Sequence, residues 1–92
     1  KEMTMEVMVS RGCGLDVHQA TVVACLLTGE PGALPRKQVK TFSAMTGGLI
    51  ELRDWLISAG CTSVAMEATG VYWKPVHNIL EGHFDLVVLS AI

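Results

Sequence analysis

Two acidic side chains, Asp16 and Glu67, stand in otherwise apolar segments and are the residues best suited to chemistry. Each comes near the carboxyl end of a predicted strand, where open α/β sheets bind ligands. Two adjacent carboxylates repel each other, and a divalent cation between them removes that conflict. Hard oxygen ligands favour Mg²⁺ or Mn²⁺ over zinc, and such ions can polarise the attacking and leaving oxygens of a phosphodiester. The pair therefore predicts half of a metal site, with further acids expected outside this chain.

Spacing alone leaves a second interpretation of both acids open. An acid at a strand end also serves as a turn or helix-cap group. The metal interpretation requires that the strands bearing Asp16 and Glu67 be parallel neighbours, so that both carboxylates reach the same edge of the sheet.

Four residues close to these acids are candidates for contacts with nucleic acid. His18 lies two residues beyond Asp16 on the same predicted face, although a solvent-facing hairpin histidine is the simpler interpretation. Tyr72 and Trp73 can stack on a base, or can pack as an aromatic pair at the start of a helix. Lys74 can meet a phosphate near that helix start, or stay solvated.

Other common chemistries lack their motifs. The three cysteines (Cys13, Cys25 and Cys61) form neither a disulfide framework nor a zinc-ligand pattern, which favours a reducing, intracellular setting. Ser58, Ser63 and Cys61 lack the strained strand-to-helix turn of a nucleophile. No phosphate-binding P-loop or dinucleotide glycine motif occurs.

Charge and composition set further limits. The 92 residues fit one domain, and half of them are apolar, which is high for a small free-standing domain. Because the chain stops in apolar sequence, we expect a truncated domain. The net charge is −2, and Arg36, Lys37 and Lys40 are the one basic cluster, more simply a solvated strand than a nucleic-acid footprint. With no signal-peptide pattern and no apolar run of about 18 residues, a cytoplasmic location is expected.

The periodicity of apolar residues predicts seven elements after a frayed start at 1–10. They are strands over 14–18, 21–27 and 37–42, a helix over 47–59, a strand over 62–67, a helix over 72–81 and a strand over 85–89. Residues 29–32 read as a turn. The order β-β-β-α-β-α-β, with short apolar later strands, predicts an α/β mixed sheet whose later strands run parallel to the first.

The helix over 47–59 is predicted from leucines at helical spacing. Thr46 is expected to cap its start and Gly60 to end it. Its apolar stripe is expected to be widened by Ile50, Trp55 and Ile57. The next helix can accept Pro75 only in its first turn, and Gly82 is expected to end it.

Two segments together resemble a known family. Residues 14–18 (GLDVH), followed some fifty residues later by 65–75 (AMEATGVYWKP), are similar to the N-terminal domain of the DEDD transposases of the insertion sequence 110 family. Phe42-Ser43 and the helix over 48–56 fit the same pattern, so the likeness runs from Cys13 onward. The resemblance implies a RuvC-type, RNase H-like fold, flanked by helices and truncated at its C-terminal end.

Carried over by position, Asp16 matches the family's first acid and Glu67 its second. Asp85 matches neither of the other two, which come after Ile92 together with a serine-bearing C-terminal domain. Gln19 stands where the family often has a lysine, which weakens a phosphate-contacting role for that turn. The resemblance implies Mg²⁺-dependent DNA cleavage and strand transfer during transposition, a guide RNA as partner, assembly of several protomers, and a place at the prokaryotic nucleoid.

Two alternative functions stay open from the sequence. An actin-like or sugar-kinase-like ATPase lobe also opens with Gly-Leu-Asp, but needs a glycine- and threonine-rich turn where this chain has His18-Gln19. A non-catalytic RNase H-like interaction domain is the second alternative.

Overall fold

The computed structural model describes residues 12–29 and 34–90. The predicted frayed start at 1–10 lies outside this part, as does most of the predicted turn at 29–32 and the end of the chain at 91–92. Within the described residues, none of the helices has the length and apolar character needed to cross a bilayer.

Seven elements follow one another in the predicted order. They are β1 (Gly12–Val17), β2 (Thr21–Thr28), β3 (Arg36–Ser43), α2 (Thr46–Ser58), β4 (Ser63–Ala68), α3 (Trp73–Leu80) and β5 (Asp85–Ser90). The predicted boundaries differ from these by one or two residues at most element ends, which is where hydrogen-bonding patterns fray.

The five strands form one mixed sheet in the order β3-β2-β1-β4-β5. β1, β2 and β3 make an antiparallel meander, whereas β1 pairs in parallel with β4, and β4 in parallel with β5. The predicted mixed sheet is confirmed, and its architecture is that of an RNase H-like fold. The parallel strands β1, β4 and β5 therefore end at a common edge of the sheet.

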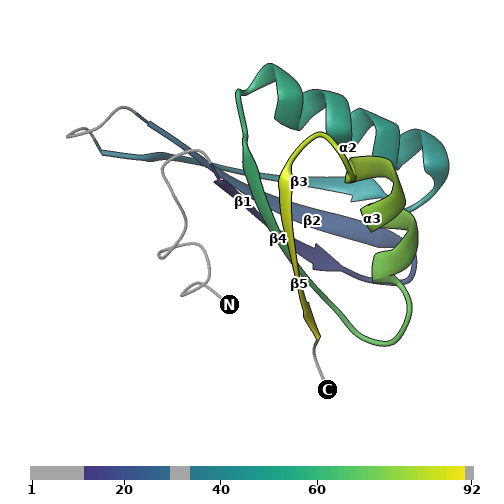
Figure 1. Cartoon of the computed structure of the whole chain (residues 1–92). Coiled ribbons are helices and arrows are strands. Elements are labelled where there is room, and N and C mark those ends of the chain that lie inside the picture. The colour runs from purple at the N-terminus through teal and green to yellow at the C-terminus, as the bar shows by residue number, and fades with distance from the viewer. Residues whose placement is uncertain (1–11, 30–33, 91–92) are drawn as a thin grey trace.

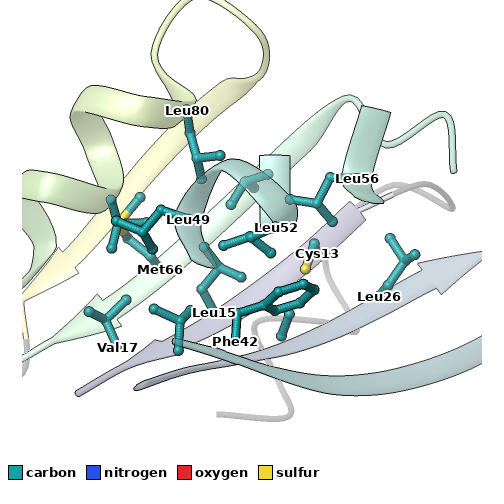
Figure 2. Close-up of a cluster of buried hydrophobic side chains, with 14 of the residues drawn as sticks. Cys13, Leu15, Val17, Leu26, Phe42, Leu49, Leu52, Leu56, Met66 and Leu80 are labelled. Carbon is teal, nitrogen blue, oxygen red and sulfur yellow. The ribbon is translucent and has the colours of Figure 1, made fainter. Parts of the chain in front are cut away.

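The two helices cover one face of this sheet, and the core lies between them and the strands (Figure 1). Strand side chains alternate between faces, so every second residue of β1, β2 and β4 enters the core. Figure 2 shows Leu15, Val17 and Met66 beneath Leu49, Leu52 and Leu80 of the helices. We call this the covered face and its opposite the outer face. Among the described residues, no element packs on the outer face, and no polar or charged residue is buried.

The ends of the helices test the predicted caps. The prediction that Thr46 caps α2 is wrong, because Met45 is the cap residue and Thr46 is already helical. The Met45 amide instead donates a hydrogen bond to the Ser43 hydroxyl at 3.0 Å. The glycine stops are confirmed, since Gly60 and Gly82 follow α2 and α3 with φ of 74° and 86°.

Helix α2 buries a narrower stripe than the sequence predicts. Leu49, Leu52 and Leu56 are buried in the core. The prediction that Ile57 widens this stripe is wrong, because its side chain points to solvent and is 48% exposed. The next residue along an α-helix is rotated by about 100°, which takes Ile57 off the face that Leu56 shares with the sheet.

Aromatic contacts attach α2 to the meander. The Phe42 and Trp55 rings lie 5.4 Å apart between centroids, and the Lys40 ammonium sits 5.1 Å from the Phe42 centroid. Lys40 and Arg36 thus share the covered face of β3 by alternation, while Lys37 lies on the outer face. The basic cluster of β3 is divided between two faces and exposed throughout, in agreement with the interpretation as a solvated strand.

Adjacent glycines in the first turn of α2 predict opposite effects on stability. A Cβ at Gly48 would overlap the Ser43 carbonyl oxygen and lie 2.7 Å from Ser43 Cβ, whereas one at Gly47 would meet nothing within 4 Å. Gly48→Ala should lower the free energy of unfolding by about 1–3 kcal/mol, because backbone atoms must move. Gly47→Ala should raise it by up to about 1 kcal/mol, because alanine loses less entropy in a helix. Urea denaturation measures both, and equal effects would contradict this packing.

Candidate active site

Asp16 and Glu67 are direct cross-strand neighbours. Each is the next-to-last residue of its strand, and the parallel register of β1 and β4 pairs Asp16 with Glu67. Neighbouring strands lie about 4.8 Å apart, so the two side chains leave the sheet side by side. The sequence hypothesis required such a shared edge, and the register supplies it.

Both acids lie on the outer face. Leu15 and Val17, the chain neighbours of Asp16, enter the core, and so do Met66 and Ala68 beside Glu67. Alternation along each strand therefore turns both carboxylates away from the helices. The side chain of Asp16 is 39% exposed and Glu67 is half-buried, so each keeps part of its surface in contact with solvent.

His18 joins this pair from the β1–β2 turn. Its Nε2 lies 3.4 Å from Oδ2 of Asp16, and its side chain is 55% exposed. The His18 amide donates a hydrogen bond to the Thr21 carbonyl at 2.9 Å, and the Ala44 amide donates one of 2.9 Å to the Ala20 carbonyl. These bonds close the β1–β2 turn and attach it to the segment between β3 and α2.

The remaining predicted residues begin α3 after the turn that follows Glu67. Gly70 makes this turn with φ of 59°, a conformation that glycine adopts without strain. Tyr72 and Lys74 are exposed, and the Lys74 ammonium lies 6.0 Å from the Trp73 ring centroid. Trp73 is half-buried against the core and meets His77 edge-on at 5.7 Å. These residues share the sheet edge of the acids, but their helix packs on the covered face.

Two of the three cysteines, Cys13 and Cys61, offer no competing nucleophile. Cys13 and Cys61 are buried, and burial raises the pKa of Cys61 to about 11 and that of Cys13 further above its ordinary value. Both thiols donate weak hydrogen bonds to backbone carbonyls, those of Gly14 and Ser63 respectively. Cys25 is half-buried on the outer face, opposite Gly14. A thiol held protonated does not attack an electrophile at neutral pH.

The donor set fits part of a metal site. In the described part of the chain, no group of three or more acidic, histidine or cysteine side chains is placed to hold an ion. Two adjacent carboxylates match the oxygen ligands that Mg²⁺ takes from a protein, since this ion keeps several waters and is held by one or two carboxylates plus substrate phosphates. The arrangement can therefore contribute ligands to such an ion at a phosphodiester.

Comparison with known protein families identifies the family of the chain. A family model described as Transposase, that of the DEDD transposases of insertion sequence 110, matches residues 13–92. The chain belongs to this transposase family. The match covers all the described elements of the transposase apart from the first residue of β1, and the resemblance drawn from the sequence is confirmed. No curated protein matches the chain.

The strand register of the transposase identifies the cross-strand neighbours of the two acids, which the sequence alone did not predict. On the outer face, Asp16 lies between its cross-strand partners Val23 of β2 and Glu67 of β4. Glu67 in turn pairs with Leu89 of β5 on its other side. Val23 and Leu89 flank the acids and were not among the predicted site residues. Both residues belong to strands that are apolar at nearly every position, so the sequence pattern does not indicate which face of the sheet each side chain occupies.

The difference between the cysteines predicts an order of modification. An aromatic disulfide reagent at pH 8 should label Cys25 of the folded transposase first, because Cys13 and Cys61 are buried and protonated. Cys13 and Cys61 should be labelled only after the protein unfolds, so adding urea should increase the number of thiols that react rapidly. Cys25→Ser provides the control and should remove the fast phase. Fast labelling in that variant would contradict the buried placement of Cys13 and Cys61.

Proposed function

We propose that this chain supplies half of the catalytic carboxylates of a DNA transposase, with Asp16 and Glu67 binding Mg²⁺ or Mn²⁺ at the phosphodiester that is cut and transferred. The observation that carries the proposal is the pairing of Asp16 with Glu67 on one face, at the edge where three parallel strands end. Membership of a transposase family makes a DNA phosphodiester the natural substrate.

Each residue has a separate task in this proposal. A bound divalent ion would supply Lewis-acid polarisation of the phosphodiester. Asp16 and Glu67 hold it by neighbouring oxygens on rigid strands, which keeps their positions well defined. His18 orients the Asp16 carboxylate through the contact at 3.4 Å. Water, substrate oxygens and further acids complete the coordination.

The start of α3 extends the proposed nucleic-acid surface. Tyr72 is exposed and can stack on a base, and the exposed Lys74 can pair with a phosphate. Trp73, half-buried beside them, supports this surface from the core side. A guide RNA and further protomers stay predictions of the family resemblance.

The ATPase lobe and the non-catalytic interaction domain are the two alternative functions. The turn after Asp16 contains His18, Gln19 and Ala20, and not the glycine- and threonine-rich sequence that an ATPase lobe needs. No observation therefore favours an ATPase. A non-catalytic interaction domain is the outcome that the first experiment below can reveal.

Metal binding tests the proposal directly. Titration of the ¹⁵N-labelled chain with Mn²⁺ should broaden the amide signals of residues around Asp16 and Glu67 before others, since the paramagnetic effect acts near the ion. Asp16→Asn and Glu67→Gln should each weaken this binding by about tenfold or more, because a neutral amide is a poorer ligand for a hard cation.

Asp85→Asn is the matched control for this titration. Asp85 is also an exposed aspartate of a parallel strand, but it stands at the start of β5, opposite Ser63 and away from the edge of the acids. Its loss should leave Mn²⁺ binding unchanged. Broadening that spreads over all acidic surface positions, or that survives Asp16→Asn, would indicate a non-catalytic domain.

The isolated chain should lack nuclease activity. Two carboxylates cannot fix both ions of a two-metal cleavage site, so a labelled DNA duplex should stay intact with the purified 92-residue chain in Mg²⁺ or Mn²⁺. Denaturing gel electrophoresis measures this. Cleavage that disappears with Asp16→Asn would overturn the idea that further acids are needed.

A further inference from the structure

The turn between β4 and α3 exposes two apolar side chains beside the acid pair. β4 ends one residue after Glu67, and residues 69–72, which follow, are all exposed. Val71 is 61% exposed and Tyr72 is 39% exposed. Single exposed apolar residues are common on protein surfaces, but these two are consecutive and lie at the edge of the sheet where the acids stand.

The structure separates the roles of the two aromatic residues at the start of α3. Trp73 is half-buried against the core and meets the His77 ring at 5.7 Å between centroids. In the described part of the chain, the Tyr72 ring has no aromatic partner. Trp73 is therefore a packing residue, and Tyr72 is the aromatic side chain with surface available to a ligand.

The backbone of this turn is open on its solvent side. A Cβ added at Gly70 would meet nothing within 4 Å, so the space beside it is empty. The Lys74 amide donates a hydrogen bond of 3.1 Å to the Val71 carbonyl, which attaches the turn to the first residues of α3. A flat ligand can come close to the backbone at a glycine, because no side chain stands in the way.

Charge is distributed along this segment in a simple pattern. Glu67 and Lys74 are charged, and the six residues between them, 68–73, carry no charged side chain. The Lys74 ammonium lies 6.0 Å from the Trp73 ring centroid, at the far end of the uncharged turn. An acid that holds a cation, an uncharged apolar turn and a lysine match a phosphate, its base and the next phosphate of a nucleic acid strand.

We propose that this turn receives a nucleobase that has left the helical stack, next to the phosphodiester at Asp16 and Glu67. The inference rests on the proposed function for the identity of the substrate and adds its conformation. Tyr72 stacks on the extrahelical base, and Val71 is an apolar wedge against the neighbouring base of the stack. Lys74 pairs with the adjacent phosphate.

The placement of the acids and of Tyr72 favours such a base over an intact duplex. The acids lie on the outer face, whereas Tyr72 begins a helix that packs on the covered face (Figure 1). A strand whose phosphate lies at the acids reaches Tyr72 only by directing its base over the edge of the sheet. In a duplex both faces of each base are covered by its neighbours, so the base must leave the stack first.

Titration of the ¹⁵N-labelled chain with three DNA hairpins tests the inference. The first is fully paired, the second has one extra nucleotide in a bulge, and the third has the same bulge without its base. In low salt and without divalent metal, the base-containing bulge should shift the amide signals of residues 69–74 and bind with a Kd about fivefold or more below that of the paired hairpin. The abasic bulge should behave like the paired hairpin, because it has the flexible backbone but nothing to stack.

Variants of exposed residues assign the effect to the turn. Tyr72→Ala should remove the preference for the base-containing bulge, whereas Tyr72→Phe should keep it, since phenylalanine retains the ring. Val71→Ser should reduce it. Ile57→Ser is the matched control for Val71→Ser, because Ile57 is 48% exposed near the end of α2, away from the edge of the acids. This variant should bind each hairpin within about twofold of wild type, and the amide spectrum of each variant checks its fold.

Three outcomes would overturn the inference: equal affinity for the paired and the base-containing hairpins, an unchanged preference in Tyr72→Ala, or no shift at residues 69–74. Because these titrations contain no metal, they are independent of the Mn²⁺ experiment. Mn²⁺ broadening around Asp16 and Glu67 without a preference for the bulge would contradict this inference alone. A preference for the bulge without Mn²⁺ binding would support it and contradict the metal proposal.

Discussion

The parallel pairing of β1 with β4 is the constraint on which the rest of this molecule depends. Because side chains alternate with a period of two, a slip of one residue would turn Glu67 into the core and Met66 out of it. The apolar residues that flank both acids make such a slip costly. Burial on the covered face thus holds two carboxylates side by side on the outer face, where repulsion would otherwise favour their separation.

The two faces of the sheet separate the core from the candidate site. Leucines of α2 and α3 pack on alternate residues of the central strands, and this covered face contains no buried polar group among the described residues. The outer face carries the acids, Cys25 and the small residues Gly14 and Ala65 in neighbouring strands. A surface built on paired strands suits a site that must hold its ligands in place while a large substrate approaches from solvent.

The direction of the parallel strands decides where the candidate site residues gather. β1, β4 and β5 run the same way, so their carboxyl ends lie at one end of the sheet. The aromatic and basic residues at the start of α3 lie at the same strand ends as the acids. The fold and the candidate site are in this way linked through the direction of β1, β4 and β5.

Much of this architecture could be predicted from local patterns. The seven elements, their order and the glycine stops follow from periodicity and turn chemistry, which depend on near neighbours in the chain. The errors have the same local origin. Thr46 has the residue type of a cap, but the Ser43 hydroxyl accepts the hydrogen bond from the Met45 amide. Ile57 lies about 100° around the helix from Leu56 and so falls outside the buried stripe.

The amino-acid sequence by itself determined the family, the order of strands and helices, and Asp16 and Glu67 as the acids of interest, because motif and period are properties of the chain. Only the tertiary structure decided that these acids are exact neighbours on the uncovered face, that Trp73 is half-buried in the core, and that β5 forms an apolar edge. Those features depend on register and on which strands lie side by side. Both arise from packing between segments far apart in the chain, and no local pattern encodes them.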